Sequence, residues 1–257
     1  MAILNERIGD RRIAKKLILF SNNNEALAVF SRADTKAEEI VAVLDIPPPK
    51  ALILIAGGAD TLDEKHKLPL VRLFGGIARA AANLDAVIID GGTQSGVMEL
   101  MGQGIADCGY QSPLIGVAPI GKVKYPGSIG EGDTDLDPNH SYFVLVEGGD
   151  WGSELDTINK LVQVFTKESA GVVILAGGGP NSINEALCAV RYNLPLIVLE
   201  GTGGMADEIA VAWRSMRRPP QDPGIAAIVA SEYTEIHPAA NSTEGLEILI
   251  TRKLTGA

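Results

Sequence analysis

Short apolar runs that end near glycine alternate with helical segments along most of this chain. The apolar runs lie at 51–56, 86–90, 113–118, 142–146, 171–176, 195–199 and 225–230. Most are apolar at every position, which is typical of strands in a parallel sheet covered on both faces. Between them the sequence predicts helices at about 68–82, 97–107, 153–167, 182–192, 205–216 and 243–253. This alternation predicts an α/β fold, a doubly wound and mostly parallel Rossmann-like sheet with helices on both faces.

The first part of the chain follows a different pattern. Apolar runs at 17–20 and 27–30 surround a polar turn, which predicts a small hairpin. A short helix is expected over 35–44, before a run of prolines. We therefore expect an N-terminal appendage over residues 1–46 and a Rossmann-like nucleotide-binding domain over 47–257.

Composition excludes several classes of function. The chain has 22 Lys and Arg against 32 Asp and Glu, a net charge of −10, so it lacks the basic surface of a nucleic-acid binder. Its cysteines, Cys108 and Cys188, have no metal-ligand spacing, and we expect no metal site. Neither a membrane-spanning apolar run nor a signal sequence is found, which predicts a cytoplasmic protein without a membrane partner.

Glycine clusters follow several of the predicted strands. The carboxyl ends of parallel strands meet at one edge of a sheet, where ligands bind. Turn geometry would explain any one cluster, but several on the same edge indicate a crevice that binds phosphate or a nucleotide. The clustered glycines are Gly57, Gly58, Gly91, Gly92, Gly177, Gly178, Gly179, Gly201 and Gly203.

The first motif is the stretch 90–99, D-G-G-T-Q-S-G-V-M-E. A strand ends at Asp90, and a helix is expected to begin near Ser95 and Gly96. The free N–H groups and the positive end of the helix dipole would then point at an anion. Thr93 and Ser95 add hydroxyl donors. Alternatively, Ser95 only caps the helix.

The second motif is the stretch 176–185, A-G-G-G-P-N-S-I-N-E, which joins a strand to a helix through small residues that include Asn181. Ser182 and Glu185 have the spacing of a capping box, in which Glu185 would bond only the start of its own helix. The alternative places the Glu185 carboxylate in the crevice, facing a ribose hydroxyl or acting as an acid or base.

Other nucleotide motifs are missing. The chain has neither the G-x-G-x-x-G of standard NAD dehydrogenases nor the G-x-x-x-x-G-K-[ST] of P-loop NTPases. Lys122 follows a predicted strand end and suits a phosphate, although a solvated surface lysine is an equal alternative.

Together the two motifs resemble those of the SLOG superfamily of Rossmann-like proteins. Its Lonely Guy members carry G-G-x-x-x-G-x-M and G-G-x-G-T-x-x-E, and the counterparts here are 91–98 and 178–185. The chain is most similar to one branch, the cytosolic N-terminal homology region of melastatin-type TRP channels and its free-standing prokaryotic relatives. That similarity extends over roughly residues 47–210 and also includes the stretches 49–58, 136–146 and 199–203.

The resemblance implies recognition of a nucleotide-derived signal, with ADP-ribose-like compounds as the first candidates. It also implies that Asn139 and His140 lie near the crevice. Glu200, Gly201 and Gly203 of the last matching stretch are further candidate ligand-binding residues.

The sequence departs from the family pattern in two places. Catalytic Lonely Guy proteins pair the second-motif Glu with an upstream Arg, whereas the segment 153–167 offers only Lys160 and Lys167 as cations. Many proteins of the channel branch have Arg where Gly204 stands here. The missing Arg partner for Glu185 favours binding over hydrolysis, and the departure at Gly204 leaves the detailed ligand open.

Two functions therefore remain. The first is a binding module for ADP-ribose, NAD or a related small molecule, which needs no cofactor. Backbone N–H groups and Lys122 would hold its phosphates, and Glu185 or Asp90 its ribose hydroxyls. The second is an N-glycosidic hydrolase in which Glu185 is the catalytic carboxylate.

We also expect a homo-oligomer, most simply a dimer. Lonely Guy relatives pair through helices, and the last helices here carry Trp213 and Met216, which are residue types enriched in interfaces.

Overall fold

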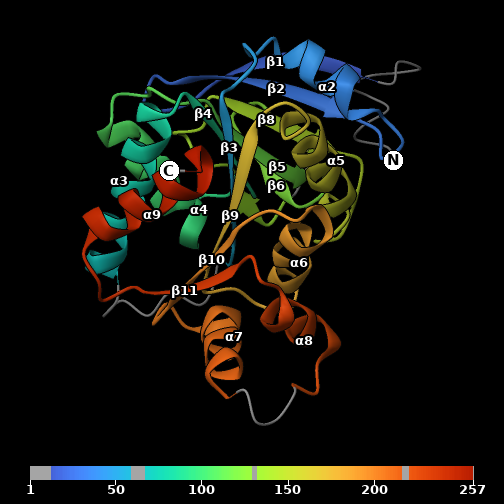
Figure 1. Cartoon of the computed structure of the whole chain (residues 1–257). Coiled ribbons are helices and arrows are strands. Elements are labelled where there is room, and N and C mark those ends of the chain that lie inside the picture. Colours follow the sequence, from blue (N-terminus) through green and yellow to red (C-terminus); the bar gives the residue numbers. More distant parts are fainter. Residues whose placement is uncertain (1–12, 59–66, 129–131, 216–219, 257) are drawn as a thin grey trace.

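The computed structural model describes residues 13–58, 67–128, 132–215 and 220–256 (Figure 1). The strands are β1 (Ile13–Leu19), β2 (Glu25–Ser31), β3 (Ala51–Gly57), β4 (Ala86–Asp90), β5 (Leu114–Pro119), β6 (Val123–Lys124), β7 (Thr134–Asp135), β8 (Tyr142–Val146), β9 (Ala170–Ala176), β10 (Leu196–Glu200) and β11 (Thr234–Pro238). The helices are α2 (Ala37–Leu44), α3 (Lys67–Asn83), α4 (Gly96–Asp107), α5 (Leu155–Phe165), α6 (Ser182–Tyr192), α7 (Gly204–Arg214), α8 (Pro223–Ala230) and α9 (Thr243–Thr255).

The main sheet has nine strands in the order β1-β2-β8-β5-β4-β3-β9-β10-β11. Every neighbouring pair is parallel except β1 and β2, which form the predicted hairpin. The chain runs outward from β3 through β4, β5 and β8, and then returns to β9 on the other side of β3. The strand order therefore reverses between β3 and β9, and ligands of doubly wound sheets bind at such a switch point.

Helices cover both faces of this sheet (Figure 1). Leu52 and Leu54 of β3 pack into a core shared with α2, α5, α6, α7 and α8. The alternating residues Ile53 and Ile55 pack into a second core, with α3, α4 and α9. Because successive side chains enter opposite cores, the strand is apolar throughout, and the predicted Rossmann-like α/β class is confirmed.

The strand predicted over 225–230 is wrong, because these residues belong to helix α8. The Asp222 side chain accepts hydrogen bonds from the N–H groups of Gly224 and Ile225, and Pro223 occupies the first turn. This cap and the proline favour a helix start, which an apolar run of six residues does not distinguish from a buried strand.

The last strand of the sheet, β11, lies a few residues further on and pairs in parallel with β10. Sequence reasoning missed it because Thr234, Glu235 and His237 interrupt its apolar character.

The N-terminal hairpin belongs to the same sheet as the rest of the chain. Strand β1 begins at Ile13, earlier than the predicted 17, and β2 pairs in parallel with β8. Residues 1–12 of the expected appendage lie outside the described residues, and the domain boundary after residue 46 stays a prediction. In the described ranges, no helix combines the length and apolar character that crossing a membrane requires.

Candidate functional site

A pocket of about 400 Å³ opens at the switch point of the sheet. It collects residues from the ends of β3, β4 and β9 and from the segments before α5 and β8, and we call it the switch-point pocket. Its lining consists of Ile55, Gly57, Gly58, Gly91, Thr93, Ser95, Met98, Thr134, Trp151, Glu154, Gly179, Pro180, Asn181, Ser182 and Glu185. The structure thus brings three of the predicted glycine clusters together around one cavity.

Helix α4 begins at the wall of this pocket. Ser95 stands at its N-cap position in an extended conformation but makes no side-chain capping bond. Its hydroxyl instead lies 3.0 Å from the Thr93 hydroxyl, and both residues line the pocket. The capping alternative for Ser95 is therefore wrong, and its hydroxyl is part of the pocket wall.

Helix α6 begins at the opposite wall. Its N-cap is Asn181, again without a side-chain capping bond, and Ser182 is already the first helical residue. Glu185 Oε2 accepts a hydrogen bond of 3.2 Å from the N–H of Gly57, at the end of β3. The capping box is therefore not formed, and the Glu185 carboxylate joins two walls of the pocket.

Two carboxylates lie in this cavity. Burial raises the pKa of Glu185 to about 8, against the opposing effect of the Gly57 hydrogen bond, and the charges of Glu154 and Asp90 raise it further. Burial also raises the pKa of Glu154, whose Oε2 accepts a hydrogen bond of 2.8 Å from the Gly152 N–H. Glu185 is thus mostly protonated at neutral pH and has an O–H to donate.

A buried charged cluster lies behind the Gly91–Gly92 turn. His140 Nε2 is 2.8 Å from Asp90 Oδ1, and His140 Nδ1 is 3.1 Å from Asp137 Oδ1. Burial lowers the pKa of His140, but the two carboxylates outweigh that effect and raise it to about 9.

Asn139 and His140, which the family resemblance placed near the crevice, do not line the pocket. His140 is fully buried behind its wall. The Asn139 Oδ1 accepts hydrogen bonds from the Tyr110 hydroxyl and the Asn22 side-chain amide.

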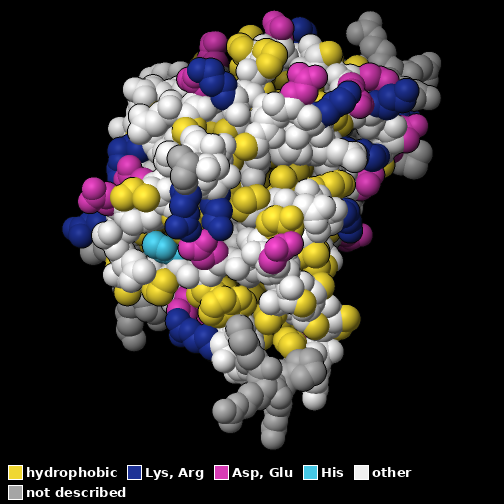
Figure 2. Space-filling view, in the orientation of Figure 1, with side chains coloured by type: hydrophobic (Ala, Val, Ile, Leu, Met, Phe, Trp, Pro, Cys, Tyr) yellow, Lys and Arg dark blue, Asp and Glu magenta, His cyan; other side chains and the backbone are white. Residues whose placement is uncertain are grey.

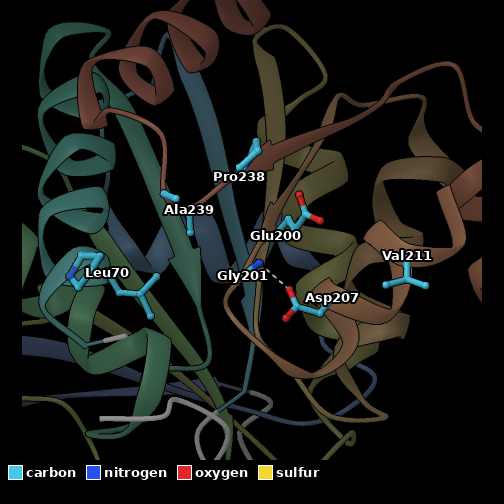
Figure 3. A pocket seen from close by; sticks show the side chains of 9 residues that line it. Leu70, Glu200, Gly201, Asp207, Val211, Pro238 and Ala239 are labelled. Atoms are coloured by element: carbon cyan, nitrogen blue, oxygen red, sulfur yellow. Dashed lines mark hydrogen bonds between the residues drawn. The ribbon is translucent and has the colours of Figure 1, made fainter. Parts of the chain in front are cut away.

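The fourth glycine cluster is not part of the switch-point pocket. Glu200 and Gly201 line a separate cavity of about 500 Å³, the outer pocket, between α3, α7 and the end of β11 (Figure 3). The Asp207 carboxylate accepts hydrogen bonds from the N–H groups of Gly201 and Gly203, at 2.6 and 3.2 Å. Glu200 is ion-paired with Arg214. The outer pocket is lined by Pro69, Leu70, Glu200, Gly201, Asp207, Val211, Pro238, Ala239 and Ala240.

The other predicted glycines shape the loops instead of lining the cavity. Gly92 and Gly178 have φ of +70° and +97°, a left-handed conformation that favours glycine. A Cβ on Gly92 would stand 2.7 Å from the Gly116 Cα. Gly96 and Gly177 also have positive φ, next to the lining residues.

Lys122 is likewise not among the lining residues. Its Nζ lies 3.4 Å from Asp133 Oδ2, next to the lining residue Thr134. In the described part of the chain, no cluster of three His, Cys, Asp or Glu side chains could hold a metal ion.

Sequence reasoning missed Trp151 and Glu154, which both line the switch-point pocket. They follow β8, whose end carries the pair Gly148–Gly149. This pair is the same strand-end signal as the other clusters and would have pointed to the segment.

Comparison with known proteins gives one family. The family model described as "SLOG in TRPM, prokaryote" matches residues 50–244. Transient receptor potential cation channel subfamily M member 2 of Mus musculus is 30% identical over 204 residues, which cover 65% of this chain and 13% of that channel. Subfamily M member 7 of Homo sapiens is 28% identical over 214 residues, 69% of this chain and 11% of that channel. The chain therefore spans a small part of the length of these relatives.

Proposed function

The chain belongs to the family described as SLOG in TRPM, prokaryote, and from this premise we propose that its switch-point pocket binds a nucleotide or a nucleotide-derived ligand. One observation carries the proposal. Helices α4 and α6 both begin at this pocket, and neither has a side-chain cap. Two helix starts without their own capping groups favour an anion between them.

The phosphate groups of the ligand would be held by the protein backbone. Neither lysine nor arginine occurs among the described residues that line the pocket. The N–H groups at the starts of α4 and α6 and the hydroxyls of Thr93, Ser95 and Ser182 would supply the donors. Such a local positive field is compatible with a net charge of −10.

The rest of the pocket suits a nucleoside. Trp151 is 40% exposed and lines the cavity, so its indole offers a face on which a base can stack. Glu154 and Glu185 present carboxyl groups that can hold ribose hydroxyls. Phosphate, ribose and base thus each have a complementary part of the wall, and ADP-ribose and NAD are the first candidates.

Isothermal titration calorimetry with ADP-ribose, NAD, AMP and ribose 5-phosphate tests the proposal. We expect ADP-ribose or NAD to bind more tightly than ribose 5-phosphate, which has no base. Trp151→Ala should weaken the dinucleotide by about 1–3 kcal/mol, the value of one stacked base, and leave ribose 5-phosphate unchanged. No heat and no thermal shift with any of the four would contradict the proposal.

The protonated state of Glu185 favours a second candidate, hydrolysis of the N-glycosidic bond of such a ligand. Glu185 would donate its proton to the departing base, and water would add to the anomeric carbon, with Glu154 as the second carboxylate. Chromatography of wild type with NAD or AMP would then detect free base over hours. Glu185→Gln should keep binding, because Gln resembles the neutral acid, but lose that release. If wild type releases no base in this assay, the hydrolase candidate fails and the binding proposal stands.

We also propose that the chain forms a dimer. Trp213 on α7 is half-buried, and Val211 on the same helix is 64% exposed. Figure 2 shows hydrophobic side chains gathering on the lower part of the molecule, over α7 and α8. Met216, the other residue expected at this interface, lies outside the described residues. Light scattering that gives the mass of a single chain at micromolar concentration would contradict a dimer.

A further inference from the structure

A closed ring of hydrogen bonds ties the Gly91–Gly92 turn to the buried His140. The Gly92 N–H donates to Asp90 Oδ1 at 2.7 Å, and the same oxygen is 2.8 Å from His140 Nε2. His140 Nδ1 is 3.1 Å from Asp137 Oδ1, and the Asp137 N–H donates back to the Gly92 carbonyl at 2.9 Å. The ring therefore holds both the N–H and the carbonyl of Gly92, which lies between the lining residues Gly91 and Thr93.

The ring is complete only with a charged imidazole. Both His140 nitrogens face carboxylate oxygens, which accept hydrogen bonds and do not donate them while ionised. A neutral imidazole has one N–H, so one of its two carboxylate contacts would lose its hydrogen bond. The ring thus needs the protonated imidazolium, and the pKa of His140, raised to about 9, keeps this form at neutral pH.

The surroundings of His140 leave little room for another arrangement. Asp90 faces it from β4 and Asp137 from the segment before β8, while the Phe143 ring of β8 stacks on it at 5.3 Å. Gly102 of α4 packs against Asp137, since a Cβ there would stand 2.1 Å from Oδ1. Asp90, Asp137 and His140 are each at most 1% exposed.

We propose that His140 is a positioning residue for the switch-point pocket: its imidazolium, held between Asp90 and Asp137, fixes the Gly91–Gly92 turn in the conformation that receives the ligand. This inference rests on the proposed function for its ligand, but the ring itself is measurable without one. The affinity of the pocket should then follow the charge of a residue that does not touch the ligand.

Amide exchange measured by NMR tests the ring directly. In His140→Asn the protection of the Gly92 amide should fall by about tenfold or more, the equivalent of one charged hydrogen bond, while Ile53 in β3 keeps its protection. His237→Asn is the matched control, since His237 is also a buried histidine but lies on β11. Gly92 protection within twofold of wild type in His140→Asn would overturn the proposal.

Asp137→Asn separates a charge effect from a merely structural one, because the amide oxygen can still accept a hydrogen bond. The imidazole midpoint, followed by NMR, should move down by about one pH unit or more when one carboxylate charge is removed. Gly92 protection and the affinity for ADP-ribose should be lost at correspondingly lower pH. A pH profile that does not move would contradict the role of the imidazolium.

A further variant perturbs the ring without substituting any residue that belongs to it. Gly102→Ala places a Cβ against Asp137 Oδ1 and should weaken Gly92 protection, whereas Gly75→Ala on α3 meets only the Arg79 guanidinium at 3.6 Å and should not. If wild type fails to bind ADP-ribose and the other ligands, the proposed function fails. The exchange data still decide whether the ring exists.

Discussion

The switch-point pocket and the outer pocket carry the same sequence signal but differ in their backbone donors. Both lie where a strand ends in glycines and a helix begins, and their volumes are about 400 and 500 Å³. At the outer pocket, Asp207 of α7 accepts the N–H groups of Gly201 and Gly203. At the switch-point pocket, the first-turn carboxylate of α6, Glu185, instead accepts the N–H of Gly57, which belongs to a different strand. The first-turn carboxylate therefore closes its own loop at the outer pocket, whereas at the switch-point pocket it joins two walls of the cavity.

The largest expected effect is the loss of ligand binding on filling the switch-point pocket. Gly179 lines it, and a Cβ on this residue meets nothing within 4 Å, so Gly179→Val puts two methyl groups into open space without straining the fold. ADP-ribose binding should become undetectable by calorimetry, while the melting temperature stays near that of wild type.

A substitution in the outer pocket is the matched control for Gly179→Val. Val211 lines it and is 64% exposed, so Val211→Ser should change neither the fold nor the affinity for ADP-ribose. If Val211→Ser abolished binding and Gly179→Val did not, the assignment of the two pockets would be reversed.

The next effect is on stability as a function of pH. The pKa of Glu185 is raised from 4.5 to about 8 in the folded protein, so the folded state holds a proton that the unfolded state releases between these values. Stability is therefore lost as the pH rises through this window. Glu185→Gln lacks this loss, and its free energy of unfolding relative to wild type should rise by about 2–4 kcal/mol from pH 4.5 to pH 8.5.

Urea denaturation at several pH values measures this difference. The raised pKa of His140, about 9, also makes stability depend on pH. The stabilisation from its protonated form is fully present below pH 6.5 and is lost as the pH rises to about 9. Because this contribution is common to wild type and Glu185→Gln, it cancels in their comparison. A difference that is constant with pH would mean that Glu185 titrates normally.

A smaller effect compares the two kinds of helix start. Asp207→Ala removes the carboxylate that accepts the N–H groups of Gly201 and Gly203 before α7, and should lower the free energy of unfolding by about 1 kcal/mol. Ser95→Ala at α4 removes no capping bond and should cost less than about 0.5 kcal/mol. The order should invert for ligand affinity, since only Ser95 lines the switch-point pocket. Equal costs in stability would remove the distinction between the pockets.

Much of the fold follows from the sequence because burial on both faces leaves a clear pattern. The strand predicted over 142–146 has the bounds of β8, and the helix predicted over 182–192 has those of α6. The pattern failed at the last part of the sheet. There the apolar run 225–230 is a helix, and β11, at the edge of the sheet, mixes polar and apolar residues.

The candidate site was predicted less completely. The glycine loops and Glu185 could be found because their residue types serve backbone geometry and anion binding. That Asp207 would claim the donors at Gly201 and Gly203 depends on how α7 is placed. Trp151 and Glu154 reach the pocket from a different part of the chain, and their positions depend on the order of β8, β5, β4 and β3 in the sheet. Local sequence patterns do not specify the order of the strands in the sheet.

The smallest expected effect concerns Lys122, which lies beside the switch-point pocket without lining it. Its Nζ faces Asp133, so its charge is largely compensated, and Lys122→Met should weaken ADP-ribose binding by about twofold at low ionic strength. Salt at about 0.5 M shortens the Debye length to a few ångströms and should remove even this difference. Lys50→Met is the control, because Lys50 precedes β3 at the opposite edge of the sheet and pairs with Asp85. Calorimetry at both salt concentrations measures the two variants. A tenfold or salt-independent loss in Lys122→Met would instead make this lysine a direct phosphate ligand, and backbone donors alone would no longer account for anion binding in the switch-point pocket.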